Sequence, residues 1–87
     1  MMRFKIRGQY WQIVWSKLPR STLGLCDWAS RTITISTSKR VKGELELDTI
    51  CHEVLHAAMP DMAEEAIDST ATSLARALTR LGYTRQP

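Results

Sequence analysis

The sequence has too few cysteines for a disulfide framework and no hydrophobic run long enough to cross a membrane. Only Cys26 and Cys51 occur among the 87 residues, and two thiols do not staple a fold as the cysteines of small secreted domains do. The N-terminal residues 1–5 alternate basic and apolar side chains where a signal peptide has a continuous apolar segment. We therefore expect neither a secreted nor a membrane protein, and we expect a cytoplasmic location.

The chain also lacks internal repeats and low-complexity segments, and its length leaves no room for a second domain. We expect a single domain over residues 1–87. A hydrophobic core of this size is marginally stable, so a bound metal would add usefully to stability. The net charge of +3 implies only a mild attraction to polyanions.

The N-terminal third of the sequence has the two-residue periodicity of strands. Apolar residues alternate with polar ones from residue 3 to residue 7 and again from residue 10 to residue 16, and Gly8-Gln9 between them can turn, which predicts a β-hairpin. Residues 23–28 and Thr32–Ser36 are further candidate strands, the second with two inward isoleucines and an outward row of hydroxyls. The expected fold class is α+β, with a small and mostly antiparallel sheet (the hairpin plus one or two further strands) packed on two helices.

The first of these helices, expected from Leu45 to Met59, carries the pentapeptide His52-Glu53-Val54-Leu55-His56. Two histidines four residues apart project from one side of a helix, at the spacing that lets both imidazoles bind one zinc ion. Glu53 then lies at the rim of that side, where it can take a proton from a metal-bound water. The apolar residues cluster on the opposite side and are expected to pack on the sheet: Leu47, Ile50, Val54, Ala57 and Ala58.

The second helix is expected from about Met62 to Leu81, after a break at Pro60 and with Asp61 as N-cap of a capping box completed by Glu64. Its expected core face comprises Ala63, Ile67, Ala71, Leu74, Leu78 and Leu81. A zinc site with two histidines needs a third protein ligand, and helix phase favours Glu64, with Glu65 as the alternative. Asp68, one turn beyond Glu64, can accept the free N–H of a ligating imidazole. Cys51 projects away from the histidines and is expected to be a small buried side chain.

With these residues, the chain resembles the zincin metallopeptidases, specifically very small gluzincin-like HExxH proteins of phage type. The resemblance covers residues 23–81 and rests on the HExxH pentapeptide, on Glu64-Ala66-Asp68, and on residues 24–27 followed by the strand at residues 33–35. The link between the two helices is much shorter than in large gluzincins, and no glycine follows His56 as it would in metzincins, so the third ligand stays open. A phage origin would place the protein in the host cytoplasm.

The resemblance implies a zinc-dependent hydrolase, and in particular a metallopeptidase that acts on a peptide or protein substrate. It implies that His52, His56 and Glu64 bind Zn²⁺ and that Glu53 is the general base. It also implies that Thr32–Ser36 can pair with an extended peptide at the edge of the cleft, whereas a plain interior strand is the alternative. The alternative function is a non-catalytic, zinc-stabilised module that binds a protein or a nucleic acid.

Basic residues form two groups, one in the first strand (Arg3, Lys5 and Arg7) and one in the loop at residues 38–43 (Lys39, Arg40 and Lys42). The first group fits a solvated strand face better than a nucleic-acid patch. The second fits a solvated connector, with a basic lip for an acidic partner as the alternative. A weak contact with nucleic acid through these residues is the one macromolecular partner, besides a peptide substrate, that the sequence suggests.

Overall fold

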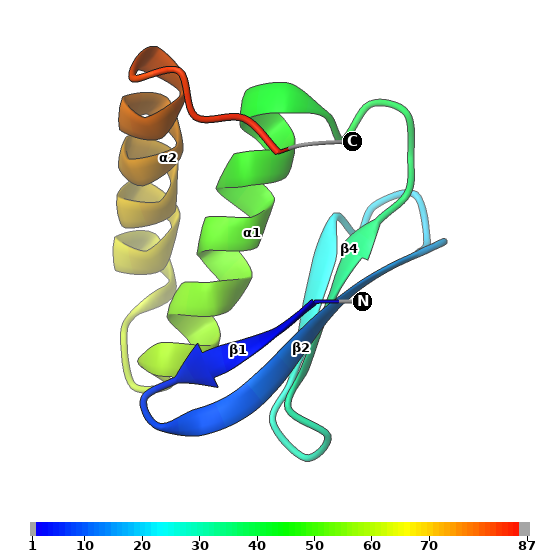
Figure 1. Ribbon diagram of the computed structural model, residues 1–87, viewed down its shortest axis with the longest axis vertical. Coiled ribbons are helices and arrows are strands. Elements are labelled where there is room, and N and C mark those ends of the chain that lie inside the picture. The colour runs from blue at the N-terminus through cyan, green and yellow to red at the C-terminus, as the bar shows by residue number, and fades with distance from the viewer. Residues whose placement is uncertain (1, 86–87) are drawn as a thin grey trace.

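The structure, a computed structural model, describes residues 2–85 and consists of one sheet and two helices in three layers. The strands are β1 (Met2–Ile6), β2 (Gln9–Ser16), β3 (Gly24–Asp27) and β4 (Thr32–Ser36), and the helices are α1 (Gly43–Ala58) and α2 (Glu64–Arg80). Helix α1 covers one face of the sheet, and α2 packs on the far side of α1 (Figure 1). The expected α+β class is confirmed.

The strand order in the sheet is β1-β2-β4-β3. The pairs β1–β2 and β3–β4 are antiparallel, as expected for a mostly antiparallel sheet, whereas β2 and β4 are parallel. The parallel pairing arises because the β3–β4 unit adds to the sheet through β4, and no residue pattern in the sequence specifies which of its two strands does so. Consequently β4 is an interior strand and β3 has a free edge, so the interior alternative for Thr32–Ser36 holds.

The N-terminal hairpin turns at Arg7 and Gly8, one residue earlier than the expected Gly8-Gln9. Both residues have positive φ angles, 49° and 83°, and Ile6 pairs with Gln9 across the turn. Two consecutive positive φ values match the right-handed twist of the flanking strands, and glycine adopts such an angle without steric cost. The guanidinium of Arg7 therefore leaves the strand face, and it donates a hydrogen bond to the carbonyl of Ala58 (2.9 Å) at the end of α1.

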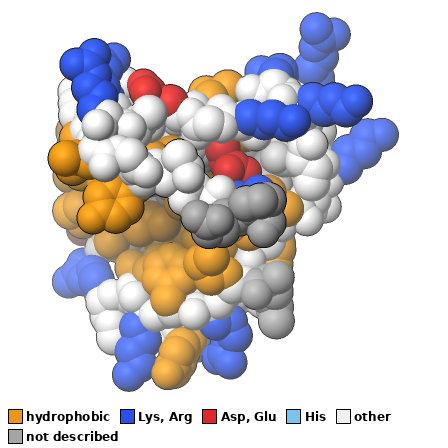
Figure 2. Space-filling view, turned by 45° about the horizontal axis from the view of Figure 1, so that its top comes forward, with side chains coloured by type: hydrophobic (Ala, Val, Ile, Leu, Met, Phe, Trp, Pro, Cys, Tyr) orange, Lys and Arg blue, Asp and Glu red, His pale blue; other side chains and the backbone are white. Residues whose placement is uncertain are grey.

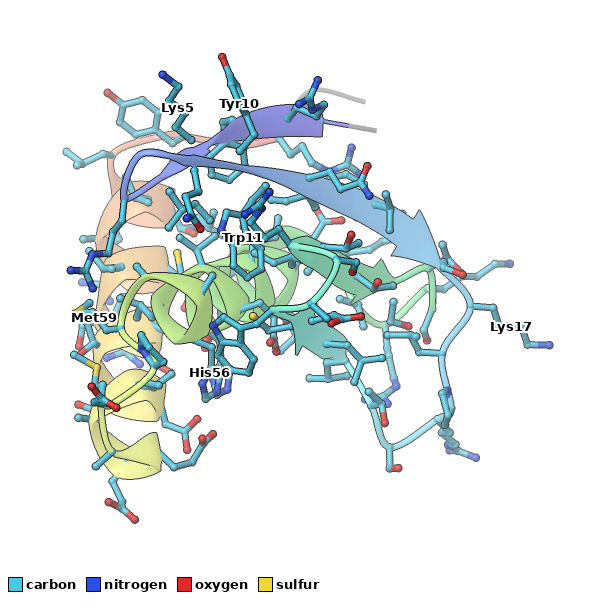
Figure 3. The ribbon with its side chains drawn as sticks, turned by 90° about the horizontal axis from the view of Figure 1, so that it is seen from below. Lys5, Tyr10, Trp11, Lys17, His56 and Met59 are labelled. Atoms are coloured by element: carbon cyan, nitrogen blue, oxygen red, sulfur yellow. The ribbon has the colours of Figure 1, made fainter. Side chains whose placement is uncertain are left out.

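The main core lies between the sheet and α1. Ile33 and Ile35 of β4 are fully buried, and Trp11 and Ile13 of β2 join them. In Figure 3, Trp11 points from the sheet toward α1, whereas Tyr10 points away from it. Four of the five apolar residues expected to face the sheet from α1 pack against this core: Ile50, Val54, Ala57 and Ala58.

A second, smaller cluster joins the two helices, and it corrects the expected core face of α2. Ile67, Ala71 and Ala75 are fully buried, whereas Leu74 and Leu81 are 44% and 72% exposed, and Ala63 is also exposed. The expectation is confirmed for Ile67 and Ala71 and wrong for the three exposed residues, because α2 packs on a single neighbour and only a narrow stripe is covered. That stripe contains alanines, which let α2 approach α1 closely.

The start of α2 also differs from the expectation. The helix begins at Glu64, its N-cap is Ala63, and no side chain caps it. Asp61 is instead part of a turn in which the N–H of Met62 donates to the carbonyl of Met59 (3.0 Å). The expected capping box is therefore absent, and Glu64 is free to interact elsewhere.

Basic side chains project from the periphery of the molecule. Figure 2 shows Lys and Arg side chains projecting from the edges of the molecule, with exposed hydrophobic side chains between them. Within residues 2–85, neither helix combines the length and the apolar composition that a membrane crossing requires.

Candidate metal centre

The two histidines of the HExxH pentapeptide meet on one side of α1. Their Nε2 atoms lie 3.1 Å apart, and their ring centroids are 4.7 Å apart. Each side chain is a little over one-fifth exposed, 22% for His52 and 23% for His56. The spacing of four residues thus brings both ring nitrogens to one point at the surface of a cleft, because residues one helical turn apart share a face.

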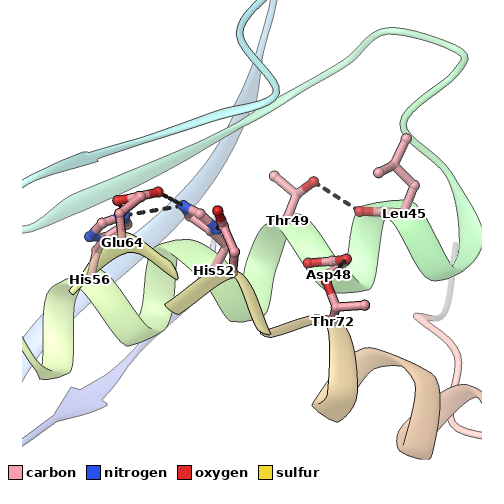
Figure 4. Close-up of polar contacts among 8 residues, drawn as sticks. Leu45, Asp48, Thr49, His52, His56, Glu64 and Thr72 are labelled. Atoms are coloured by element: carbon pink, nitrogen blue, oxygen red, sulfur yellow. Dashed lines mark hydrogen bonds and ion pairs between the residues drawn. The ribbon is translucent and has the colours of Figure 1, made fainter. Parts of the chain in front are cut away.

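Glu64, the first residue of α2, completes a triangle of donor atoms with these nitrogens. Its Oε1 lies 3.2 Å from Nε2 of His52, and its Oε2 lies 3.3 Å from Nε2 of His56. Figure 4 shows the carboxylate reaching from α2 across to both imidazoles. The short turn between the helices makes this approach possible, because it returns the start of α2 to the last turns of α1.

The donor set and its spacing fit a zinc ion. Ligands at about 2.0–2.1 Å from a tetrahedral zinc lie about 3.3–3.4 Å from one another, close to the 3.1–3.3 Å between these donor atoms. Within residues 2–85, one group of His, Cys, Asp or Glu side chains has converging donor atoms, and it consists of His52, His56 and Glu64. Three protein ligands leave a fourth position for solvent, as in catalytic zinc sites.

Asp68 supports this centre from one turn further along α2. Its Oδ1 lies 3.1 Å from Nδ1 of His52. This is an ion-pair distance, and it places the Asp68 carboxylate beside the ring nitrogen of His52 that does not face Glu64. The sequence predicted a place for Asp68 beside the ligating imidazole; its role toward a metal stays a prediction.

The alternative ligand Glu65 is exposed and does not belong to the converging group. Cys51 also lies outside it, and packs against the cluster between the helices that contains Leu55, Ile67 and Ala71. Of the two carboxylates left open by the sequence, the structure therefore brings Glu64 to the histidines.

Glu53 is buried beside the candidate metal ligands. It is only 8% exposed, yet it has neither a hydrogen bond nor an ion pair with any described side chain. Burial raises the pKa of the Glu53 carboxyl, His52 and His56 oppose the rise, and Glu64 adds to it. A carboxylate with a raised pKa and free lone pairs is suited to accept a proton from water.

Gly24, at the start of β3, defines the position of the Glu53 side chain. A Cβ atom at Gly24 would lie 3.1 Å from Cγ and 3.2 Å from Oε2 of Glu53, and 2.9 Å from Cγ2 of Thr49. The absence of a side chain lets β3 approach α1 closely at this point. This contact was not predicted, although a glycine inside a strand is a signal of close backbone approach.

A cleft of about 440 Å³ extends from Glu53 along α1 toward its N-terminus. One wall is the segment that leads into β3, and the other is formed by α1 and the first turns of α2. Thr49 and Asp48 lie on the α1 side, where Thr49 donates to the carbonyl of Leu45 (2.8 Å) and Asp48 accepts from Thr72 (2.9 Å) (Figure 4). His52, Glu53 and Asp68 are among the lining residues, so the cleft opens onto the candidate site.

At the other end of the site, Trp28 forms an aromatic wall. Its ring meets that of His56 edge-on, with the centroids 6.5 Å apart, and it is 48% exposed. Because Gly24 contacts Glu53 and Trp28 contacts His56, β3 and the residue that follows it run alongside the metal centre. Figure 3 shows His56 on the side of α1 away from Lys5 and Tyr10.

Comparisons of this chain with protein-family models, with curated proteins and with solved structures found no match.

Proposed function

We propose that this chain is a zinc-dependent peptidase in which His52, His56 and Glu64 hold the metal and Glu53 is the general base. The observation that carries the proposal is the convergence of three ligand atoms beside Glu53, a largely buried residue that lines the cleft and whose carboxylate forms no hydrogen bond or ion pair within residues 2–85. The resemblance to small gluzincin-like zincins supports the same assignment, and the expected location is the cytoplasm, that of the host if the chain is of phage origin.

Each residue then has a distinct task. Zinc bound at the three ligands would supply Lewis acidity, which acidifies water and polarises a carbonyl group. Glu53 accepts a proton from the attacking water and passes it to the amine nitrogen as the C–N bond of the peptide breaks. The Asp68 carboxylate, 3.1 Å from Nδ1 of His52, keeps that imidazole oriented.

The substrate is proposed to be an extended peptide that pairs with β3. This strand has a free edge in the sheet and runs past Glu53 and His56, so main-chain hydrogen bonds along it would bring a peptide bond to the metal centre. The earlier expectation placed this pairing on Thr32–Ser36, but both edges of that strand are already occupied by β2 and β3.

The test combines metal analysis with hydrolysis. The purified chain should contain about one zinc per molecule, and it should cleave casein or an unbiased library of fluorogenic peptides in a manner abolished by a chelator and restored by zinc. Glu53→Gln, purified in parallel, controls for contaminating peptidases, since it should hold zinc without hydrolysis. A chain that binds one zinc but cleaves no peptide in the library would favour the alternative of a zinc-stabilised binding module.

A further inference from the structure

A second hollow, separate from the metal centre, lies where β2 and β4 end. It has a volume of about 600 Å³ and is lined by the loops that follow the two strands. Four of its lining residues are basic and three are hydroxyl residues, and no acidic or aromatic residue lines it; the full set is Lys17, Leu18, Arg20, Ser36, Thr37, Ser38, Lys39 and Arg40. We call this site the basic hollow.

The parallel pairing of β2 and β4 creates the basic hollow. Because Ser16 pairs with Ser36, the two parallel strands end at the same end of the sheet. The segments that follow them, residues 17–20 and residues 37–40, therefore lie next to each other. The sequence separates these two groups of basic residues by about twenty positions, so their meeting could not be read from it.

Hydrogen bonds hold the two loops in register. The N–H of Thr37 donates to the carbonyl of Ser16 (3.0 Å), and the N–H of Ser36 donates to the carbonyl of Leu23 (2.8 Å). The Arg40 guanidinium also donates to the carbonyl of Arg20. The bond from Thr37 and the contact between Arg40 and Arg20 join the two loops directly, and such contacts lower the entropy that binding has to overcome.

The charges of the basic hollow have no counterpart inside the protein. All four basic side chains are exposed, and across residues 2–85 none of them forms an ion pair. Other basic residues are engaged: Arg85 pairs with Glu46, and Arg3 and Lys5 flank the ring of Tyr10. Figure 2 shows Lys and Arg side chains gathered at the upper right of the surface, on the side where Figure 1 places the loops after β2 and β4.

We propose that the basic hollow binds the phosphate backbone of a nucleic acid, without sequence preference. Lysine, arginine and hydroxyl side chains are the groups that contact phosphates in such complexes. A lone phosphate monoester carries about two negative charges and would leave half of the four cations uncompensated, whereas a backbone supplies one charge per nucleotide. Because Leu18 is the one apolar side chain in the hollow, the site offers an acidic peptide little area for side-chain packing.

This proposal extends beyond the peptidase function and does not depend on it. Arg20 is followed directly by residues 21–24, which line the metal-centre cleft, so a bound nucleic acid would lie beside the entrance of that cleft. The hollow therefore provides a means of concentrating the protein on nucleic acid or on nucleoprotein.

The test is fluorescence anisotropy with two labelled DNA duplexes of unrelated sequence. The variant Lys17→Gln/Arg20→Gln/Lys39→Gln/Arg40→Gln removes the charge of the hollow. A control with the same loss of charge, Arg3→Gln/Lys5→Gln/Arg76→Gln/Arg80→Gln, changes exposed residues of the sheet and of α2. Lys17→Gln/Lys39→Gln is a milder variant that leaves the contact between Arg40 and Arg20 intact.

The unmodified chain should bind both duplexes equally. With about four phosphate contacts, the affinity should fall about 100-fold between about 50 and about 200 mM salt. The variant of the hollow should bind at least about tenfold more weakly than the charge-matched control, and the double variant should lie between them with a shallower salt dependence.

Three results would overturn the proposal. The first is an absence of duplex binding at low salt. The second is an equal loss of binding in the variant of the hollow and in its charge-matched control, which would reduce the effect to net charge. The third is a polyglutamate chain that displaces the duplex at a lower concentration of charge than unlabelled DNA does, which would assign the hollow to an acidic protein surface.

Discussion

Gly24 of β3 faces Glu53 of α1 so closely that a Cβ atom on the glycine would stand 3.2 Å from the carboxylate oxygen Oε2. The edge strand and the proposed general base are therefore positioned by the same contact. The φ angle of Gly24 is not positive, so the requirement for glycine here is space and not backbone freedom.

Gly24→Ala should consequently impair turnover while sparing the metal. The added methyl group would push Glu53 and Thr49 aside, and a displacement of this kind next to reacting groups lowers kcat by about 10- to 100-fold. Zinc content and kcat measured on the same preparation separate the two effects. Arg76→Ala, at an exposed position of α2 that does not line the cleft, is the control and should retain kcat. An unchanged kcat in Gly24→Ala would show that Glu53 is not positioned by β3.

Much of the fold could be predicted from local patterns. The strands at the N-terminus follow from a two-residue alternation, and the apolar side of α1 follows from its helical periodicity, because both patterns depend on burial against a single neighbouring layer. The histidine pair could be predicted for the same reason, since the spacing between His52 and His56 is a property of the helix itself.

The remainder depends on tertiary arrangement that local patterns do not encode. The choice of β4 as the partner of β2 determined both the free edge at β3 and the existence of the basic hollow. The start of α2 was placed too early because Asp61 and Glu64 resemble a capping box, although Glu64 instead interacts with the histidines across the turn. Glu64 could either cap the helix or contact the histidines, and the packing of α2 on α1 determines that it contacts the histidines.

Two substitutions should separate zinc binding from the general-base role of Glu53. Glu53→Gln preserves shape and removes the proton acceptor, so we expect zinc near one equivalent and a loss of kcat of at least about 100-fold. His52→Ala removes a ligand, so we expect loss of the metal together with a lower unfolding temperature. Metal analysis, peptide hydrolysis and thermal unfolding on both variants test this. Full activity in Glu53→Gln would refute the general-base role.

The third ligand can be identified by comparing two adjacent carboxylates. Glu64→Gln should weaken zinc binding strongly, because the carboxylate lies within 3.3 Å of both Nε2 atoms and an amide is a poorer ligand. Glu65→Gln, one residue along and exposed, should bind zinc as the unmodified chain does. Competition with a chromogenic chelator gives the zinc affinity of each variant. The reverse order of affinities would assign the site to Glu65.

Asp68 should influence the metal only through His52. Asp68→Asn loses the negative charge that lies 3.1 Å from Nδ1 of His52, and the loss of such a partner typically weakens metal affinity about 10- to 100-fold. Asp61→Asn, in the turn before α2, removes the same charge without touching His52 and should bind zinc as the unmodified chain does. Competition with a chromogenic chelator gives the zinc affinity of both variants. Equal losses of affinity in Asp68→Asn and Asp61→Asn would indicate a general electrostatic contribution instead.

The thiol of Cys26 reports on the contact between β3 and α1 through its titration. Burial, with additional contributions from Glu53 and Asp27, raises the pKa of Cys26 from 9.0 to about 11. A raised pKa in the folded state means that this thiol stabilises the fold fully below about pH 9, and that the contribution is lost as the pH rises through about 11. In a Cys51→Ser background, the rate of alkylation by iodoacetamide should rise with pH to a midpoint near 11, because the thiolate is the reactive form. The same chain unfolded in urea should show its midpoint near 9.0. Coincident midpoints in the folded and unfolded chains would mean that the fold does not bury Cys26 against the main core, where it packs as a partly buried residue.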